Sequence, residues 1–208
     1  MAEVERLCSS VLMMKNGIII DQDSHKALGI LASNFYGNPS YDLKVIGVTG
    51  TNGKTSVATM LYGLFESLGY PAGLLSTVKV CFGGFEKEAT HTTPDPLQIQ
   101  AHLAAMKKAG ITHCFMEVSS HGIAQERISG ISFSGGVFTN LTHDHLDYHK
   151  TFAAYRDTKK RFFDQLPQQA FALINADDKN GVVMVQNCKA KTYTYAIKNY
   201  ADFIMKKF

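Results

Sequence analysis

Short apolar runs alternate with amphipathic segments along most of this chain. Residues 44–49, 113–118, 136–139 and 170–174 are continuous apolar runs of strand length. Runs of this kind are typical of parallel strands whose two faces are both covered. The pattern therefore predicts an α/β fold, with a mostly parallel sheet and helices on both faces.

Three longer segments are expected to be helices, from their apolar period or from their capping residues. Apolar residues recur between Val57 and Leu68, where Gly69 provides a C-cap. A second helix is expected to open at Asp95-Pro96 and to close at Gly110, and a third to cover 152–166. Between the first two, residues 78–89 have the pattern of an inserted hairpin that turns at Gly83-Gly84.

Residues 1–42 differ from the rest and are expected to form a separate appendage. Within them, 17–20 is a predicted strand and 24–36 a predicted helix. The run Gly37-Asn38-Pro39-Ser40 then breaks regular structure and is the natural linker. We expect one main domain over 43–208.

The composition excludes several classes of protein. The net charge of +3 suits an anionic ligand such as a nucleotide but is no signature of nucleic-acid binding. The four cysteines are far apart, which argues against a zinc ribbon or a disulfide framework. No signal peptide is apparent, and no apolar stretch approaches the roughly 20 residues of a membrane span. We expect a cytoplasmic monomer with no nucleic-acid or membrane partner.

The sharpest motif lies between the first predicted strand and the first long helix. In such a loop, glycines let backbone N–H groups turn toward phosphate oxygens, and the helix N-terminus adds positive potential. A lysine reaches the terminal phosphates, and a hydroxyl can bind Mg²⁺. The usual first glycine of a P-loop is replaced by Val48, and the alternative interpretation is a glycine-rich turn with a surface lysine. The predicted nucleotide-binding residues are Gly50, Thr51, Asn52, Gly53, Lys54, Thr55 and Ser56.

Four other segments place polar side chains after strands or before helices. Thr92-Thr93-Pro94 can bind an anion or cap a helix, and capping is the simpler interpretation. Glu117 ends a buried strand, where a carboxylate could hold Mg²⁺ opposite the P-loop. The segment 139–149 is dense in His and Asp and suggests a metal, although it misses the H-x-H-x-D-H pattern of metallo-β-lactamase-like hydrolases by one residue, Tyr148. Asn175 begins a turn that capping explains adequately.

Lys159 lies within an otherwise apolar stripe of the helix predicted over 152–166. One interpretation is a lysine that extends its amine to water. The other is a partly buried amine with a lowered pKa, whose neutral form can react with CO₂. Periodicity alone favours the first, and Lys160 lies at the edge of the stripe.

Five of these motifs, in this order over about residues 15–208, resemble those of the Mur ligase family. The spacing from Gly47 to Thr55 is the form of phosphate loop used by that family and by its folylpolyglutamate synthetase relatives. The Thr-Thr-Pro segment, together with the run 117–122 (EVSSHG), resembles the family's tripeptide synthetases. Ile123 and His143 depart from the common pattern, where Leu and Arg are usual.

The resemblance implies roles for individual residues. It implies that His145, Lys54 and a carbamylated Lys159 take part in catalysis, and that Asn175 lies on the adenine side. The implied metal set is Thr55, Glu117, His145 and Lys159. The implied contacts to the UDP-muramoyl substrate are Thr92, Thr93, Ser119, Gln125 and Arg127.

The implied activity is that of an ATP-dependent amide ligase of peptidoglycan precursor synthesis. ATP and Mg²⁺ would activate the D-Glu carboxylate of UDP-MurNAc-L-Ala-D-Glu as an acyl phosphate, which a diamino acid (meso-diaminopimelate or L-lysine) then attacks. By the same resemblance, 1–42 is the tail of an N-terminal UDP-binding domain, 43–208 is an incomplete ATP-binding central domain and the C-terminal domain is absent. The isolated chain is therefore expected to be inactive. The alternatives are a folylpolyglutamate synthetase-like ligase and a non-catalytic ATP-binding fragment.

Overall fold

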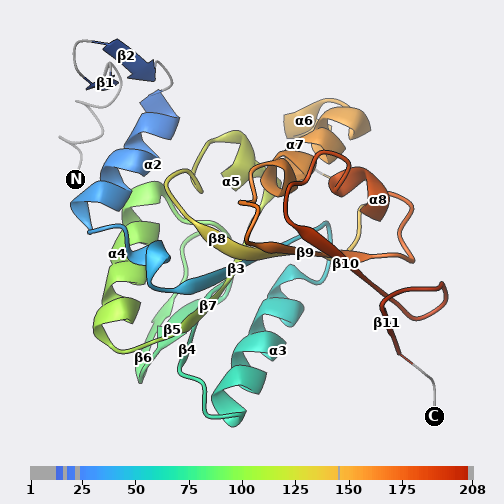
Figure 1. Cartoon of the computed structure of the whole chain (residues 1–208), viewed down its shortest axis with the longest axis horizontal. Helices are drawn as coiled ribbons and strands as arrows, with labels where there is room; N and C mark the ends of the chain where they lie inside the picture. The colour runs from blue at the N-terminus through green and yellow to red at the C-terminus, as the bar shows by residue number, and fades with distance from the viewer. Residues whose placement is uncertain (1–12, 16–17, 22–23, 145, 206–208) are drawn as a thin grey trace.

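A nine-stranded, mostly parallel sheet organises the chain (Figure 1). The computed structural model describes residues 13–15, 18–21, 24–144 and 146–205. The strand order is β11-β10-β9-β8-β3-β7-β4-β5-β6, and only β5 and β6 are antiparallel to their neighbours. The strands are β3 (Lys44–Thr49), β4 (Ala72–Leu75), β5 (Lys79–Phe82), β6 (Phe85–Glu88), β7 (His113–Glu117), β8 (Phe133–Phe138), β9 (Phe171–Asn175), β10 (Lys191–Ala196) and β11 (Phe203–Ile204).

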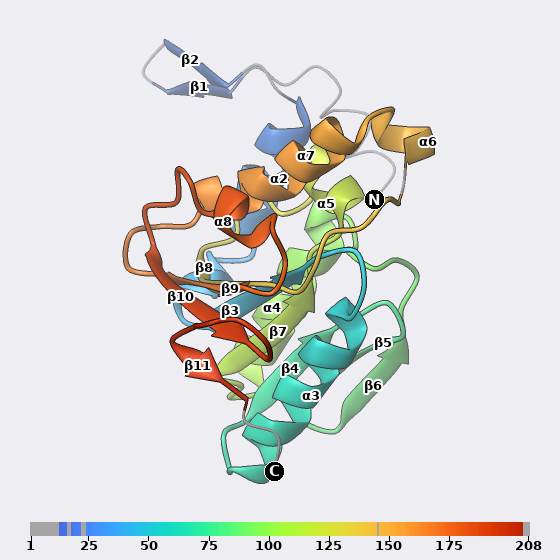
Figure 2. The same cartoon turned by 90° about the vertical axis from the view of Figure 1, so that its right-hand side faces the viewer.

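Helices cover both faces of this sheet, as the sequence predicted, but unequally. In Figure 2, α3 (Lys54–Ser67) lies alone on one side, and the other helices lie opposite. The cause is the direction of the connections. The β3-to-β4 crossover runs along the sheet one way, and the later crossovers run the other way, so right-handed connections place them on opposite faces. The opposite layer contains α4 (Pro96–Lys108), α5 (Ser120–Ala124), α7 (Phe152–Asp164) and α8 (Gly181–Met184).

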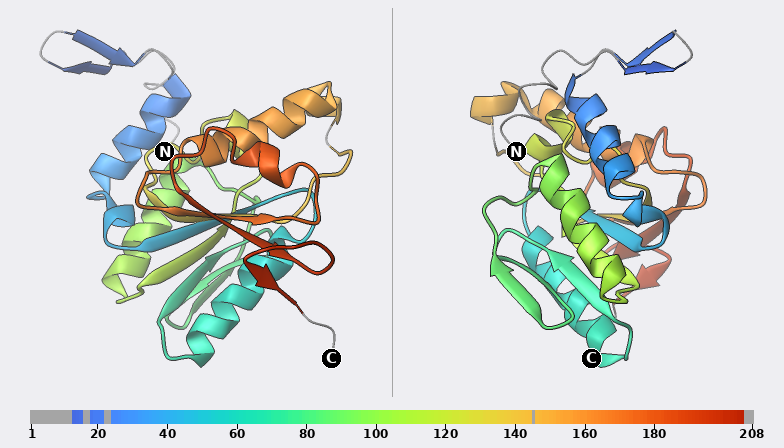
Figure 3. Two further views of the ribbon diagram at one scale, coloured as in Figure 1. Left: turned by 45° about the vertical axis from the view of Figure 1, so that its right-hand side comes forward. Right: turned by 90° about the vertical axis from the view of Figure 1, so that its left-hand side faces the viewer.

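The segment before the sheet packs on that same layer. A short antiparallel pair, β1 (Met13–Lys15) and β2 (Ile18–Asp21), precedes α2 (Ser24–Phe35), and α2 contacts α4 (Figure 3). A 3₁₀ turn, η1 (Pro39–Tyr41), then leads into β3. The helix expected over 24–36 is thus confirmed. The predicted strand 17–20 is observed from Ile18 onward, and residue 17 lies outside the described residues.

Most predicted elements appear within a few residues of their expected bounds. The hairpin at 78–89 is observed, and Gly83 and Gly84 both have positive φ, at 51° and 83°, as a tight two-residue turn requires. The Asp95 carboxylate accepts a hydrogen bond from the backbone N–H of Gln98 at 2.9 Å and so caps α4. The prediction missed β4, which is a run of only four residues (AGLL). It also missed β10, whose alternating pattern, KTYTYA, is polar on one face.

The expected apolar face of α3 is only half used. Val57, Leu61 and Phe65 pack against the sheet, whereas Met60 and Leu64 are 72% and 51% exposed. No other described helix lies beside α3 on its face, so the outer half of its stripe remains uncovered. Next to it, an open apolar groove of about 440 Å³ lies over the sheet between α3 and Tyr195. No described helix is long and apolar enough to cross a membrane.

Candidate nucleotide and metal site

The polar motifs meet at one edge of the sheet because they follow neighbouring parallel strands. The strands β7, β3, β8 and β9 are adjacent in that order, and a polar segment follows each of them. Ligand sites in open α/β sheets lie at this carboxyl edge, where the direction of the connections reverses. The P-loop after β3 therefore lies between Glu117 at the end of β7 and the loop that follows β8.

The P-loop is held in shape by the loop after β8. The Asn140 carbonyl accepts from the Thr51 N–H at 2.8 Å, and the Asn140 side chain accepts from the Asn52 N–H at 3.0 Å. Gly50 has φ 150°, and a Cβ there would lie 1.9 Å from Thr139 Oγ1. Gly53, with φ 84°, begins α3 as its N-cap. Both glycines thus occupy positions that a side chain would strain or block.

Lys54 folds back over the loop that carries it. Its Nζ donates to the Gly50 and Thr51 carbonyls at 3.0 and 2.9 Å. Burial lowers the pKa of Lys54, and the negative charges of Glu117 and Asp144 partly oppose that shift. The amine therefore lies against the loop, within electrostatic reach of two carboxylates. Ser56, also predicted for this site, is exposed in the first turn of α3.

Thr55 and Glu117, both predicted metal ligands, are in direct contact. The Thr55 hydroxyl donates to Glu117 Oε2 at 3.0 Å, and the Thr77 N–H donates to Oε1 at 2.7 Å. Glu117 is only 1% exposed, so its carboxylate is fixed at the end of β7. Oxygen donors of this kind fit Mg²⁺. His145 lies outside the described residues, and within the described part of the chain no group of three His, Cys, Asp or Glu side chains could hold a metal.

Lys159 is buried on α7 and reaches the same loop. The side chain is 1% exposed, and its Nζ donates to the Gly50 carbonyl at 2.9 Å. Burial lowers its pKa well below the ordinary value, and the Lys54 charge lowers it further, against the opposing charge of Asp144. Lys160, one residue on, instead pairs with Asp164 at 2.7 Å. Of the two interpretations of Lys159, the structure contradicts the one that periodicity alone favoured, in which the amine extends to water. The helix packs this face against the P-loop and buries the amine.

Four of the five predicted substrate residues, all except Gln125, lie in one cluster around Thr93. The Thr93 hydroxyl lies 3.0 Å from the Glu117 carbonyl and 3.0 Å from Ser119 Oγ. Arg127 Nη1 donates to the Thr93 carbonyl at 2.8 Å. Thr92 is less buried and accepts from the Thr77 hydroxyl at 3.1 Å. The cluster is thus linked to Glu117.

The remaining predicted residues lie at the margins of this edge. Gln125 Nε2 lies 3.4 Å from the Tyr148 hydroxyl, at the end of α5. Asn175 Nδ2 donates to the Thr139 carbonyl at 2.8 Å, and its Oδ1 accepts from the Asp177 N–H at 2.9 Å. Asn175 therefore caps a turn, as the simpler interpretation held, and also holds the loop that supports the P-loop.

Sequence reasoning missed three residues at this edge. Asp144 acts electrostatically on both lysines, Asn140 supports the P-loop, and the Tyr155 hydroxyl contacts Thr51 at 3.1 Å. Asp144 lies in the segment 139–149, which the sequence analysis identified as dense in His and Asp, but the role there was given to His145. Tyr155 appeared only as one member of an apolar stripe.

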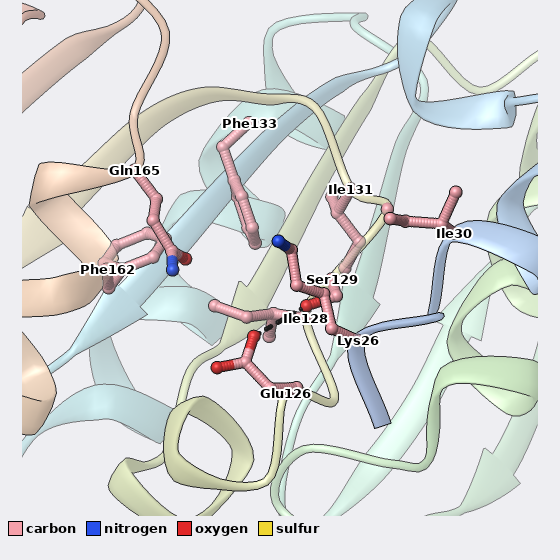
Figure 4. Close-up of a pocket in the computed structure, with 10 residues that line it drawn as sticks. Lys26, Ile30, Glu126, Ile128, Ser129, Ile131, Phe133, Phe162 and Gln165 are labelled. Carbon is pink, nitrogen blue, oxygen red and sulfur yellow. Dashed lines mark hydrogen bonds between the residues drawn. The ribbon is translucent and has the colours of Figure 1, made fainter. Parts of the chain in front are cut away.

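A separate cavity of about 310 Å³ lies between α2 and α7 (Figure 4). At its floor, the Glu126 carboxylate accepts from Ser129 Oγ at 2.8 Å and pairs with Arg161 of α7. Glu126 has φ 53°, a strained conformation for a non-glycine residue. None of the predicted site residues lines this cavity. The lining residues are Lys26, Ile30, Glu126, Ile128, Ser129, Gly130, Ile131, Phe133, Phe162 and Gln165.

The comparison with known families decides the family of the chain. The model of the Mur ligase middle domain matches residues 48–208. The chain belongs to the Mur ligase family. A Mur ligase of Cytophaga hutchinsonii named UDP-N-acetylmuramoyl-L-alanyl-D-glutamate–2,6-diaminopimelate ligase is 60% identical over 186 residues, which are 89% of this chain and 38% of that protein. The chain thus spans well under half the length of that relative.

Solved structures agree with this assignment. A structure of a ligase of the same name is 30% identical to this Mur ligase chain, with a TM-score of 0.78, over 92% of this chain and 41% of that one. Mycobacterium tuberculosis folylpolyglutamate synthase complexed with ADP and AMPPCP is 18% identical, with a TM-score of 0.67, over 95% of this chain and 51% of that one. At that identity the second likeness shows a shared fold alone.

Proposed function

We propose that this chain forms the nucleotide- and metal-binding part of an ATP-dependent amide ligase that extends UDP-MurNAc-L-Ala-D-Glu by a diamino acid. The observation that carries the proposal is the contact of Thr55 with the buried Glu117 carboxylate beside Lys54 of the P-loop. The names of the relatives favour diaminopimelate over lysine as the amine. In this proposal, 1–42 belongs to a UDP-binding domain and 43–208 to the ATP-binding domain.

The residues of the chain would act by positioning and by charge. The P-loop N–H groups and Lys54 would hold the ATP phosphates, since phosphoryl transfer depends mainly on electrostatic stabilisation of the transferring group. Thr55, Glu117, His145 and a carbamylated Lys159 would hold Mg²⁺, which when bound neutralises charge on the phosphates. Ser119, Arg127 and the two threonines near β7 would orient the acceptor, so that its carboxylate attacks the γ-phosphorus. The bond from this phosphorus to the β,γ-bridging oxygen would break, giving an acyl phosphate and ADP.

Nucleotide binding tests the first part of this proposal. Lys54→Ala should weaken the affinity for Mg²⁺–ADP about tenfold or more, because a charge-assisted hydrogen bond to phosphate is lost. The measurement is isothermal calorimetry. Lys107→Ala is the matched control, since Lys107 lies in the last turn of α4, away from the P-loop, and pairs there with Asp42. Equal affinities in the Lys54 and Lys107 variants would remove the P-loop assignment.

A segment exchange tests the reaction itself. Residues 48–208 would replace the matching segment of the Cytophaga hutchinsonii relative, which is 60% identical. We expect the chimera to form tripeptide product from UDP-MurNAc-L-Ala-D-Glu, ATP and diaminopimelate, and to lose this activity with Lys54→Ala. A folded chimera that binds ATP but forms no amide would point to a non-catalytic segment, and turnover of a folate acceptor would point to the alternative ligase.

The carbamate on Lys159 is a separate proposal with its own measurement. The buried amine favours its neutral, CO₂-reactive form, whereas the Lys160 ammonium is held by Asp164. Carbon-13 NMR with labelled bicarbonate, Mg²⁺ and nucleotide should show a carbamate signal that vanishes in Lys159→Ala and persists in Lys160→Ala. A signal that persists in Lys159→Ala and vanishes in Lys160→Ala would contradict the proposal and place the carbamate on Lys160.

A further inference from the structure

Tyr155 is a fully buried tyrosine that the proposed mechanism does not use. It lies on α7, one helical turn before Lys159, and is 0% exposed. A buried tyrosine hydroxyl needs a hydrogen-bond partner, and this one lies 3.1 Å from Thr51 Oγ1 of the P-loop. The contact joins residues 104 positions apart in the sequence. It therefore ties α7 directly to the P-loop.

The same Thr51 oxygen is also hydrogen-bonded to the loop that follows β8. The Thr142 N–H donates to Thr51 Oγ1 at 3.0 Å, and the Thr51 hydroxyl donates to the Thr142 carbonyl at 3.3 Å. A hydroxyl oxygen has one proton to donate and can accept two hydrogen bonds. The Tyr155 hydroxyl is the third hydrogen-bonding group at this oxygen, at 3.1 Å. Three segments from different parts of the chain thus meet at a single oxygen atom.

The ring of Tyr155 contacts the other functional group on its helix. Lys159 Nζ lies 4.8 Å from the centroid of this ring while it donates to the Gly50 carbonyl. The His149 ring lies 5.2 Å from the same centroid. One side chain therefore limits where the Lys159 amine can lie and where Thr51 of the P-loop can lie.

We propose that Tyr155 is a positioning residue that fixes the P-loop and the Lys159 amine relative to each other, its hydroxyl holding Thr51 and its ring confining Lys159. Its effect on ligand binding rests on the proposed function, because it concerns the same nucleotide site. Its effect on the loop does not, because the contact with Thr51 can be tested without any nucleotide.

Two readouts on Tyr155→Phe test the proposal. This variant keeps the ring and removes only the hydroxyl. Amide hydrogen exchange over residues 50–54 and at Thr142 should accelerate about fivefold or more, because a hydrogen bond that keeps the loop closed is lost. The affinity for Mg²⁺–ADP should fall about five- to tenfold. Tyr62→Phe is the matched control, because it removes a partly buried hydroxyl from the middle of α3.

Faster exchange and weaker nucleotide binding in Tyr155→Phe, with neither change in Tyr62→Phe, would support the proposal. Unchanged exchange would overturn it, and so would faster exchange with unchanged affinity. If the parent chain binds no nucleotide, the proposed function fails, and exchange alone then decides whether Tyr155 positions the loop. Should Tyr155→Phe unfold, Thr51→Val removes the same contact from the loop side and is expected to give the same exchange pattern.

Discussion

At the scale of single residues, neighbours that look equivalent in the sequence have unequal roles in the structure. Thr92 and Thr93 belong to one motif. Thr93 is 1% exposed, and its hydroxyl contacts the Glu117 carbonyl and the Ser119 N–H at the end of β7. Thr92 is less buried, and its hydroxyl accepts from the Thr77 hydroxyl. Lys159 and Lys160 differ in the same way. Burial, rather than residue type, separates the members of each pair.

The threonine pair gives a prediction about stability. Thr93→Val should lower the free energy of unfolding by roughly 2–3 kcal/mol, because it leaves the buried Glu117 carbonyl and the Ser119 N–H without their partner. Thr92→Val should change it by less than about 0.5 kcal/mol, as for most surface substitutions. Urea unfolding of both variants provides the measurement. Equal losses would show that the motif acts as a unit.

At the scale of elements, the P-loop requires a glycine at position 50, whereas the helix that follows it does not require one at position 63. Gly50 lies where a Cβ would strike Thr139, whereas Gly63, inside α3, has no atom within 4 Å of a Cβ built on it. A glycine inside a helix destabilises it relative to alanine, because glycine loses more backbone conformational entropy on folding. At Gly63 no close contact requires the absence of a side chain. Gly50 is therefore needed for the geometry of the P-loop, whereas Gly63 only lowers the stability of α3.

Alanine at each position tests this difference. Gly63→Ala should raise the free energy of unfolding by about 0.5–1 kcal/mol without an effect on nucleotide binding. Gly50→Ala should lower it by about 2 kcal/mol or more and abolish detectable nucleotide binding, since the loop must move away from Thr139. Thermal unfolding with and without Mg²⁺–ADP measures both effects. A stable Gly50→Ala variant with full affinity would contradict the assigned loop geometry.

At the scale of the whole molecule, the buried lysine couples the stability of the fold to pH. The folded chain lowers the pKa of Lys159, mainly by burial, while the unfolded chain keeps the ordinary lysine value of about 10.5. Between the folded and the unfolded pKa, the unfolded state binds more protons, so this lysine makes the free energy of unfolding rise with pH. At neutral pH the buried Lys159 amine consequently lowers the free energy of unfolding.

Lys159→Met should remove that cost. We expect the variant to be more stable than the parent by roughly 1–3 kcal/mol at pH 7, and the difference to shrink as the pH approaches 10. The Gly50 carbonyl keeps Lys54 as a donor in the variant. Lys160→Met, which removes a partly buried i,i+4 pair with Asp164, should change stability by less than about 1 kcal/mol at every pH. A Lys159→Met protein that is less stable across this range would mean that the amine stabilises the fold.

The sequence by itself determined the elements and the family. Continuous apolar runs and the 3.6-residue period are local consequences of burial on both faces or on one face. Most core strands and the long helices could therefore be predicted within a few residues, but the short buried strand β4 could not. The P-loop could also be predicted, because a glycine-rich turn between a strand and a helix is a local feature. The polar pattern of β10 and the short helix α8 gave no comparable local signal.

Only the tertiary structure decided which residues meet and which are buried. Tyr155 and Thr51 are far apart in the chain, and their contact depends on the order of strands in the sheet and on the face that each crossover covers. The burial of Lys159 against Gly50 and the exposure of half of α3 have the same origin. A periodic stripe states that one side of a helix is apolar, but what covers that side depends on neighbours supplied by distant segments.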